Sequence, residues 1–86
     1  MNKIKLTIIS KEKIVYQDEA DAVFVPTQSG LIEVLPEHMQ LVSALQKGEI
    51  VVKKGNSETK FKITAGVLEV RKNSNVIILA DIEKEE

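Results

Sequence analysis

His38 is the only histidine in the chain, and its imidazole is the side chain best suited to proton transfer near neutral pH. Glu37 is adjacent and Glu33 lies five residues earlier, so a general acid–base pair with either glutamate is one hypothesis. Adjacent residues on a strand point to opposite faces, which disfavours Glu37. No serine–histidine–aspartate arrangement accompanies His38, and scattered carboxylates around one histidine make a weak metal site. We therefore expect no catalytic residue and no metal site, and we expect His38 at a surface or an interface.

The glycines and the lysines form the other clusters that could do chemistry. The glycines match neither a dinucleotide-binding nor a Walker phosphate loop, so they indicate turns and close strand approaches, and we expect no cofactor. They are Gly30, Gly48, Gly55 and Gly66. Four lysines flank one predicted hairpin and are typical of a solvated, protected sheet edge: Lys53, Lys54, Lys60 and Lys62.

Length and composition exclude several classes of protein. The 86 residues suffice for one domain, 43% of them are hydrophobic, and there is no cysteine to make disulfides or thiolate metal sites. A net charge of −1 and only three aromatic residues argue against a nucleic-acid partner. No apolar run approaches the ~20 residues that span a bilayer, and the first residues do not resemble a signal peptide, so we expect no direct lipid insertion.

The order of the residues predicts strands. Ile4, Leu6 and Ile8 alternate with polar residues, which is the pattern of a half-buried strand. Gly55-Asn56 between two β-branched runs predicts a hairpin. We expect further strand-like runs at 14–16, 22–25, 31–35, 67–70 and 76–79, with 18–21 separating the first two and turns at 26–30 and 72–75. Short strands at this spacing predict an all-β sandwich or barrel.

Two segments are ambiguous. Within 37–47, Met39, Val42 and Leu45 have helical spacing, but a short apolar run fits a strand equally well. In the last six residues, Asp81 could cap a helix that is too short to hold by itself in water. We therefore expect one domain over residues 1–80 and a short charged tail over 81–86.

Two blocks of sequence resemble the epsilon subunit of the F-type rotary ATP synthase, which is called delta in mitochondria. The first block contains Gly30, Val34, Leu35, Pro36 and His38, followed by Leu41, Ala44, Leu45 and Gly48. The second is ITAGVLEVRKNSNVIILAD, residues 63–81. The resemblance implies a flattened antiparallel β-sandwich of two packed sheets, the amino-terminal domain of that subunit, and favours extended structure over 37–47.

The resemblance also implies a function and partners. A subunit of this family is a non-catalytic part of the central stalk. It binds the gamma subunit, rests on the c-ring, contacts the catalytic head only indirectly, and supports the coupling of ion flow to ATP synthesis. Its location would be the cytoplasmic face of the bacterial plasma membrane, as a peripheral part of the complex.

Position in the family pattern implies two sets of partner-binding residues. The gamma side would be Ser10, His38, Met39 and Ser43. The c-ring side would be Ser29, Gly30, Leu31, Ile32 and Glu33. The family often has glycine where this chain has Glu33 and Glu37, and sometimes an acidic residue where it has Leu31, so a charge has moved along the loop.

Relatives continue after the Leu-Ala-Asp block into a helical hairpin that can inhibit ATP hydrolysis, and in some members binds ATP. This chain ends five residues past Asp81, so we expect it to provide neither function. The residues alone also fit a stand-alone β-sandwich interaction module, which remains the alternative. An acid–base enzyme using His38 is the third reading.

Overall fold

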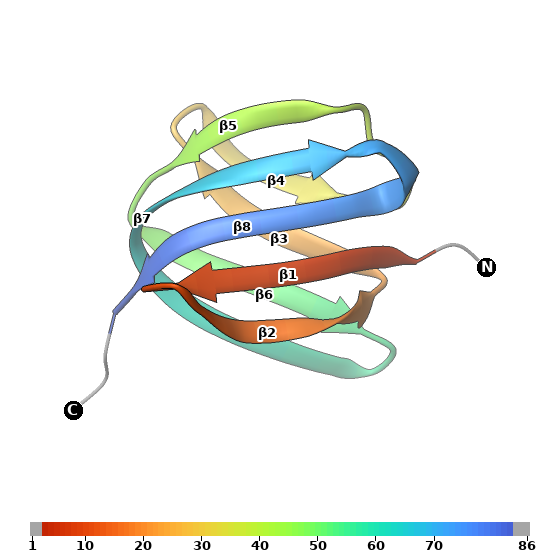
Figure 1. Ribbon diagram of the computed structural model, residues 1–86, viewed down its shortest axis with the longest axis horizontal. Helices are drawn as coiled ribbons and strands as arrows, with labels where there is room; N and C mark the ends of the chain where they lie inside the picture. The colour runs from red at the N-terminus through yellow and green to blue at the C-terminus, as the bar shows by residue number, and fades with distance from the viewer. Residues whose placement is uncertain (1–2, 84–86) are drawn as a thin grey trace.

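The computed structural model describes residues 3–83, which form strands and one 3₁₀ turn (Figure 1). The strands are β1 (Ile4–Ser10), β2 (Lys13–Ala20), β3 (Ala22–Thr27), β4 (Gly30–Val34), β5 (Leu41–Leu45), β6 (Gly48–Lys54), β7 (Ser57–Arg71) and β8 (Asn75–Ile82). The 3₁₀ turn η1 (Lys72–Ser74) joins β7 to β8. The predicted all-β class is confirmed.

The strands follow one hydrogen-bonded path that folds over into two packed layers. The path is β2-β1-β8-β7-β5-β3-β4, and β6 pairs with both β3 and β7. We call β2, β1, β8, β5 and residues 66–71 of β7 the front layer (Figure 1). The rear layer contains β4, β3, β6 and residues 57–63 of β7. β7 is 15 residues long and belongs to both layers, so the sandwich is built from one continuous sheet.

Neighbouring strands are antiparallel, as predicted, with one exception. β1 and β8 lie side by side in the middle of the front layer and run parallel, with Lys5 opposite Asn75 and Ile9 opposite Leu79. Parallel neighbours need a long connection between them. Here the connection between β1 and β8 contains all the other strands, so the pairing of the first strand with the last one completes the front layer.

The core is aliphatic and lies between the layers. Ile4, Leu6 and Ile8 are fully buried on the inner side of β1, as the alternation predicts. The front layer also contributes Leu68, Val76 and Ile78 to the core, and the rear layer adds Val23, Val25, Val34, Ile50, Val52 and Ile63. Burial of aliphatic side chains is the main favourable term for a domain of this size.

The turn between β3 and β4 is shorter than expected. Pro26 and Thr27 belong to β3 and Gly30 begins β4, so only Gln28 and Ser29 remain as the turn. The Thr27 hydroxyl donates to the carbonyl of Gly30 (2.6 Å) and accepts from the N–H of Ser29 (3.2 Å). The buried hydroxyl closes the turn, which explains why a polar residue lies in the core.

Other boundaries also differ from the sequence-based expectation. The acidic residues at 18 and 19 do not end the strand before them, because β2 continues to Ala20. Residues 41–45 form β5, so the helical spacing in 37–47 is overridden by pairing with β7. Asp81, which could have capped a short helix, does not begin one, because β8 continues through Asp81 to Ile82. Residues 84–86 of the predicted tail lie outside the described residues.

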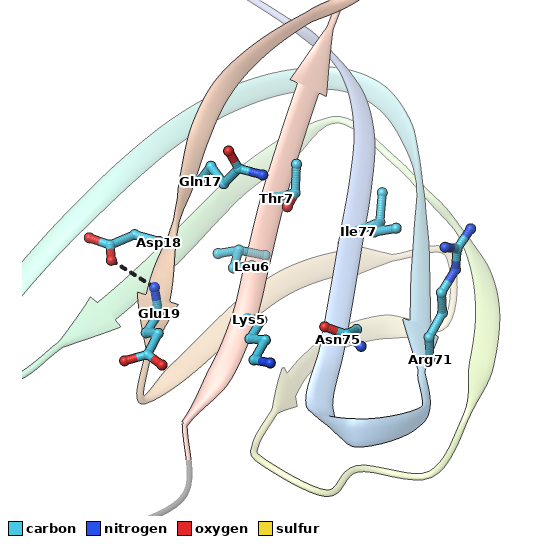
Figure 2. Close-up of a pocket in the computed structure, with 9 residues that line it drawn as sticks. All are labelled: Lys5, Leu6, Thr7, Gln17, Asp18, Glu19, Arg71, Asn75 and Ile77. Carbon is cyan, nitrogen blue, oxygen red and sulfur yellow. Dashed lines mark hydrogen bonds between the residues drawn. The ribbon is translucent and has the colours of Figure 1, made fainter.

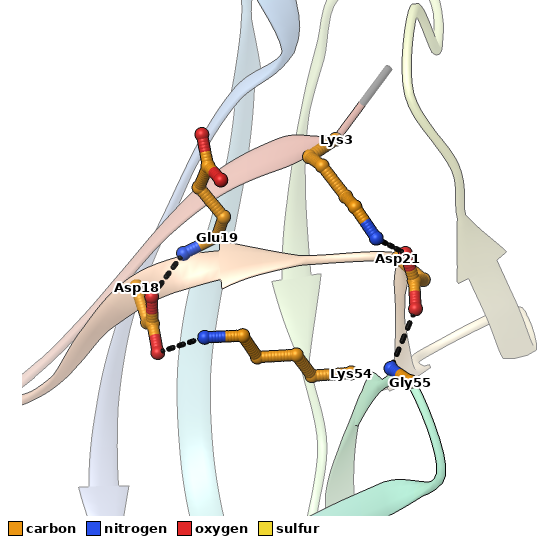
Figure 3. Close-up of polar contacts among 6 residues, drawn as sticks. All are labelled: Lys3, Asp18, Glu19, Asp21, Lys54 and Gly55. Carbon is orange, nitrogen blue, oxygen red and sulfur yellow. Dashed lines mark hydrogen bonds and ion pairs between the residues drawn. The ribbon is translucent and has the colours of Figure 1, made fainter. Parts of the chain in front are cut away.

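Charged side chains clasp the β2–β3 corner to the β6–β7 hairpin (Figure 3). Asp21 pairs with Lys3 and accepts a hydrogen bond from the N–H of Gly55 (2.7 Å). Lys54 donates to Asp18 (2.6 Å), whose carboxylate also accepts from the N–H of Glu19 (2.8 Å). These hydrogen bonds, first those from the lysines and then those from the backbone, lower the pKa of both Asp18 and Asp21.

Candidate interaction surface

The outer side of the front layer carries a row of apolar side chains that runs across all of its strands. In register, Ile14 of β2 lies opposite Ile9 of β1, Ile9 opposite Leu79 of β8, Leu79 opposite Val67 of β7, and Val67 opposite Ala44 of β5. Residues directly opposite each other across strands have Cβ atoms ~5 Å apart, so the row is continuous. We call these five residues the apolar row.

The apolar row is exposed although it contains four large hydrophobic side chains. Ile14 is 57% exposed, Leu79 50% and Val67 41%. Single exposed hydrophobic residues are normal on a protein surface, but a contiguous set indicates an interaction site. The row is therefore the strongest sign of a partner on this molecule.

The same face becomes more polar along the strands. The next row reads Gln17, Thr7, Ile77, Glu69 and Val42, and the row beyond it reads Glu19, Lys5, Asn75 and Arg71. A shallow hollow of about 540 Å³ lies over this polar end, and Figure 2 shows its lining side chains on four neighbouring strands. Arg71 donates to Glu69 (3.0 Å), and this hydrogen bond is the main cause of a raised pKa at Arg71.

A second hollow, of about 470 Å³, lies at the apolar end of the face. Its floor is formed mainly by Ile9, Gly66, Val67, Leu79 and Ala80. Lys11, Glu12 and Asp81 also line it, and we call it the turn hollow because the first two form the β1–β2 turn.

The residues predicted for the gamma side lie at different places around the front layer. Ser10 ends β1 beside the turn hollow, and Ser43 lies on β5 between two exposed residues. His38 and Met39 precede β5 at the opposite end, beside η1. Met39 is 75% exposed, whereas His38 is half-buried. The four residues do not form one cluster, but all belong to strands or connections of the layer that carries the apolar row.

The residues predicted for the c-ring side lie on the rear layer. Ser29 is in the β3–β4 turn, and Gly30, Leu31, Ile32 and Glu33 follow it on β4. Ile32 points toward the core, while Leu31 is 67% exposed. β4 is the last strand of the path and, among residues 3–83, pairs only with β3. This set is therefore separate from the apolar row.

The surroundings of His38 do not resemble an acid–base site. Its Nδ1 donates to the carbonyl of Met39 (2.8 Å), and its backbone N–H donates to Leu35 (3.2 Å). Glu37 and His38 line one hollow of about 840 Å³ beside η1, but Glu33 does not line it. Within residues 3–83, no three histidine, cysteine or carboxylate side chains are grouped as metal ligands. The described residues also contain no helix that is long and apolar enough to cross a bilayer.

The chain matches a known family of β-sandwich domains. Residues 3–85 match the model of the β-sandwich domain of the ATP synthase delta/epsilon chain. The chain belongs to this family. The ATP synthase epsilon chain of Dehalococcoides mccartyi strain BAV1 is 41% identical over 81 residues, which cover 94% of this chain and 57% of that protein. The epsilon chain of Desulforamulus reducens is 40% identical over 90% of this chain and 58% of its own length.

Solved structures agree with the fold of the delta/epsilon family. A chain of the Euglena gracilis mitochondrial ATP synthase superposes with a TM-score of 0.88 at 24% identity, covering 93% of this chain and 51% of that chain. A chain of the Tetrahymena thermophila mitochondrial ATP synthase central stalk and c-ring gives 0.76 at 16% identity. This chain thus spans little more than half the length of the curated relatives named above.

The apolar row was not predicted from the sequence, although one signal of it was present. A one-sided strand alternates, but Ile8-Ile9 and Ile77-Ile78-Leu79 are apolar on both faces. Such runs indicate a strand that is covered on both sides. In a two-layered delta/epsilon domain only one side can face the core, so the other members of these runs lie on the outer face of the front layer.

Proposed function

We propose that this chain is a non-catalytic subunit of the central stalk of an ion-translocating rotary ATP synthase. It binds the gamma subunit with the outer face of the front layer and meets the c-ring through the β3–β4 turn and β4. Its work is to hold the stalk to the ring, so that ion-driven rotation is transmitted to the catalytic head. It acts at the cytoplasmic face of the bacterial plasma membrane, as a peripheral part of the complex.

The apolar row carries this proposal. Ile14, Ile9, Leu79, Val67 and Ala44 cross five strands on the side away from the core. A face that is apolar in the middle and polar toward one end has the composition of a protein–protein interface. The family membership supports an ATP synthase as the complex, and the Tetrahymena chain of the same fold comes from a central stalk and c-ring structure.

The two layers suit a coupling role mechanically. The gamma-facing surface is on the front layer and the ring-facing loop is on the rear layer, and β7 passes through both. Because hydrogen-bonded strands connect the two surfaces without a flexible linker, force applied at one is passed to the other through the core. Inhibition of ATP hydrolysis is not part of the role proposed for these residues.

A binding assay with the gamma subunit encoded in the same genome tests the proposal. We expect the wild-type chain to bind, and Val67→Asp with Leu79→Asp to abolish binding because charges would be buried at the interface. His38→Ala with Met39→Asp tests the predicted gamma-side residues separately, and we expect it to weaken binding. Glu49→Lys, on the outer side of the rear layer, is the control and should bind normally.

The outcomes separate the candidate functions. Circular dichroism must first show that each variant keeps its strands, which is expected because the substituted side chains are exposed or half-buried. Binding by the Val67/Leu79 variant would overturn the assignment of the gamma surface to the apolar row. Failure of the wild-type chain to bind gamma would instead favour the stand-alone interaction module.

A further inference from the structure

The β1–β2 turn is built from residues that do not suit its backbone. Lys11 and Glu12 form a two-residue turn closed by the pair Ser10 and Lys13, and both have positive φ, 51° and 67°. Turns of this kind favour Asn-Gly, because most L-residues are strained at positive φ. Strain that persists in a surface turn is a sign of a function for the side chains there.

The function suggested by the geometry lies in the turn hollow. Glu12 comes from the β1–β2 turn and Asp81 from the end of β8, and both line the hollow, together with Lys11. Within residues 3–83, neither the Glu12 nor the Asp81 carboxylate makes an ion pair or a side-chain hydrogen bond. The floor between them is the apolar row itself, at Leu79 and Val67.

We propose that the Lys11–Glu12 turn is a specificity element for the stalk partner. The partner inserts an apolar side chain into the turn hollow and places a lysine or arginine beside it, against Glu12 and Asp81. This inference rests on the proposed function, because the hollow is continuous with the surface assigned there to gamma.

The chemistry favours this occupant over others. The hollow is open and shallow, so a small ligand would remain largely in water, whereas a docking protein surface would cover it. An apolar partner side chain alone would leave two carboxylates desolvated with only Lys11 nearby as a counter-charge, which is costly. A cation beside the apolar side chain removes that cost and steers the partner into register.

The turn offers a substitution whose effects on stability and on binding have opposite signs. Glycine adopts a positive φ without strain, so we expect Glu12→Gly to raise the thermal midpoint of the domain by about 4 °C. The same change deletes one of the two carboxylates that line the turn hollow, so we expect gamma to associate about threefold more slowly at low salt. A rise in stability with unchanged association would overturn the proposal, because the side chain would then have no role in binding.

Charge reversal sharpens the test. Glu12→Lys should slow association about tenfold at low ionic strength, and the difference should shrink as salt rises to about 0.5 M. Glu49→Lys changes the net charge equally on the rear layer, and it should leave the rate unchanged. An equal effect of both reversals would overturn the proposal, since only overall charge would matter. Loss of wild-type gamma binding would refute the proposed function instead, so the two failures are distinguishable.

Discussion

Tyr16 on β2 and Phe61 on β7 meet edge to face, with ring centroids 6.0 Å apart and ring planes at 77°. The two strands belong to different layers and are not hydrogen-bonded to each other. The aromatic pair therefore joins the layers at the side of the sandwich where β2, in the part of the chain that the structure describes, pairs with β1 alone. Both rings pack against the aliphatic core, and this burial is the largest cause of the raised pKa of Tyr16.

The aromatic pair should contribute measurably to stability. An edge-to-face pair is worth ~1 kcal/mol beyond its buried area. We expect Tyr16→Leu and Phe61→Leu each to destabilise the domain, and the double variant to lose about 1 kcal/mol less than the sum. Urea unfolding of the four proteins measures this coupling. Strict additivity would show that the rings contribute only apolar area.

The clasp of Asp18 and Asp21 should make stability depend on acid. Both carboxyls have a folded-state pKa below the ordinary aspartate value of 3.8, because lysine and backbone N–H groups donate to them. A depressed folded pKa adds stability above the unfolded pKa, and that stability is lost as pH falls through 3.8 toward the folded value. We expect Asp18→Asn with Asp21→Asn to flatten the decline in urea midpoint between pH 5 and pH 2.5.

Asp81→Asn is the matched control for this comparison, since in the described part of the chain the backbone carbonyl of Asp81, and not its carboxylate, accepts a side-chain hydrogen bond. It should retain the wild-type decline. If the urea midpoint of the Asp18/Asp21 double variant fell with pH as it does in the wild type, these ion pairs would contribute nothing to stability in solution.

The strands could be predicted from the sequence wherever a single period dominates. Ile4, Leu6 and Ile8 alternate with polar residues because one side of β1 faces the core. Gly55-Asn56 marks the β6–β7 hairpin because the backbone needs a positive φ at Gly55. Local rules failed at Pro26, which composition assigns to a turn. Its carbonyl accepts from the N–H of Gln46 (2.9 Å), a tertiary contact that the sequence does not reveal.

The candidate surface could be predicted only in part. The resemblance identified residues around the front layer, but not the apolar row between them. Ile9, Val67 and Leu79 look like core residues in the sequence, because each lies in a run of hydrophobic residues. Only the register of β1, β7 and β8 determines which member of each run points outward.

Gly66 explains why β7 can be one continuous strand beside β8. A Cβ at this position would lie 2.6 Å from the carbonyl oxygen of Leu79 and 3.0 Å from the Cβ of Ala80. The obstructing atoms belong to or adjoin the backbone of the neighbouring strand, so they cannot move aside without weakening the pairing. We expect Gly66→Ala to lower the free energy of unfolding by about 1–3 kcal/mol.

Gly55→Ala provides the comparison in chemical denaturation. A Cβ there meets nothing within 4 Å, but φ is 59°, so only backbone strain of ~1 kcal/mol is expected. Gly66→Ala should therefore be the more destabilising of the two. The reverse order would mean that β7 and β8 separate easily at Gly66, against the close approach described above.

Leu31 should affect coupling without affecting the fold or gamma binding. Its side chain is 67% exposed on β4, in the rear layer, away from the apolar row. Leu31→Asp therefore leaves the core intact, but places a charge where we propose that the c-ring is met. In reconstituted ATP synthase we expect lower ATP-driven ion pumping at unchanged ATP hydrolysis, because rotation would no longer be passed fully to the ring. The complex with Glu49→Lys should pump normally. Wild-type pumping by the complex with Leu31→Asp would show that β4 does not contact the c-ring.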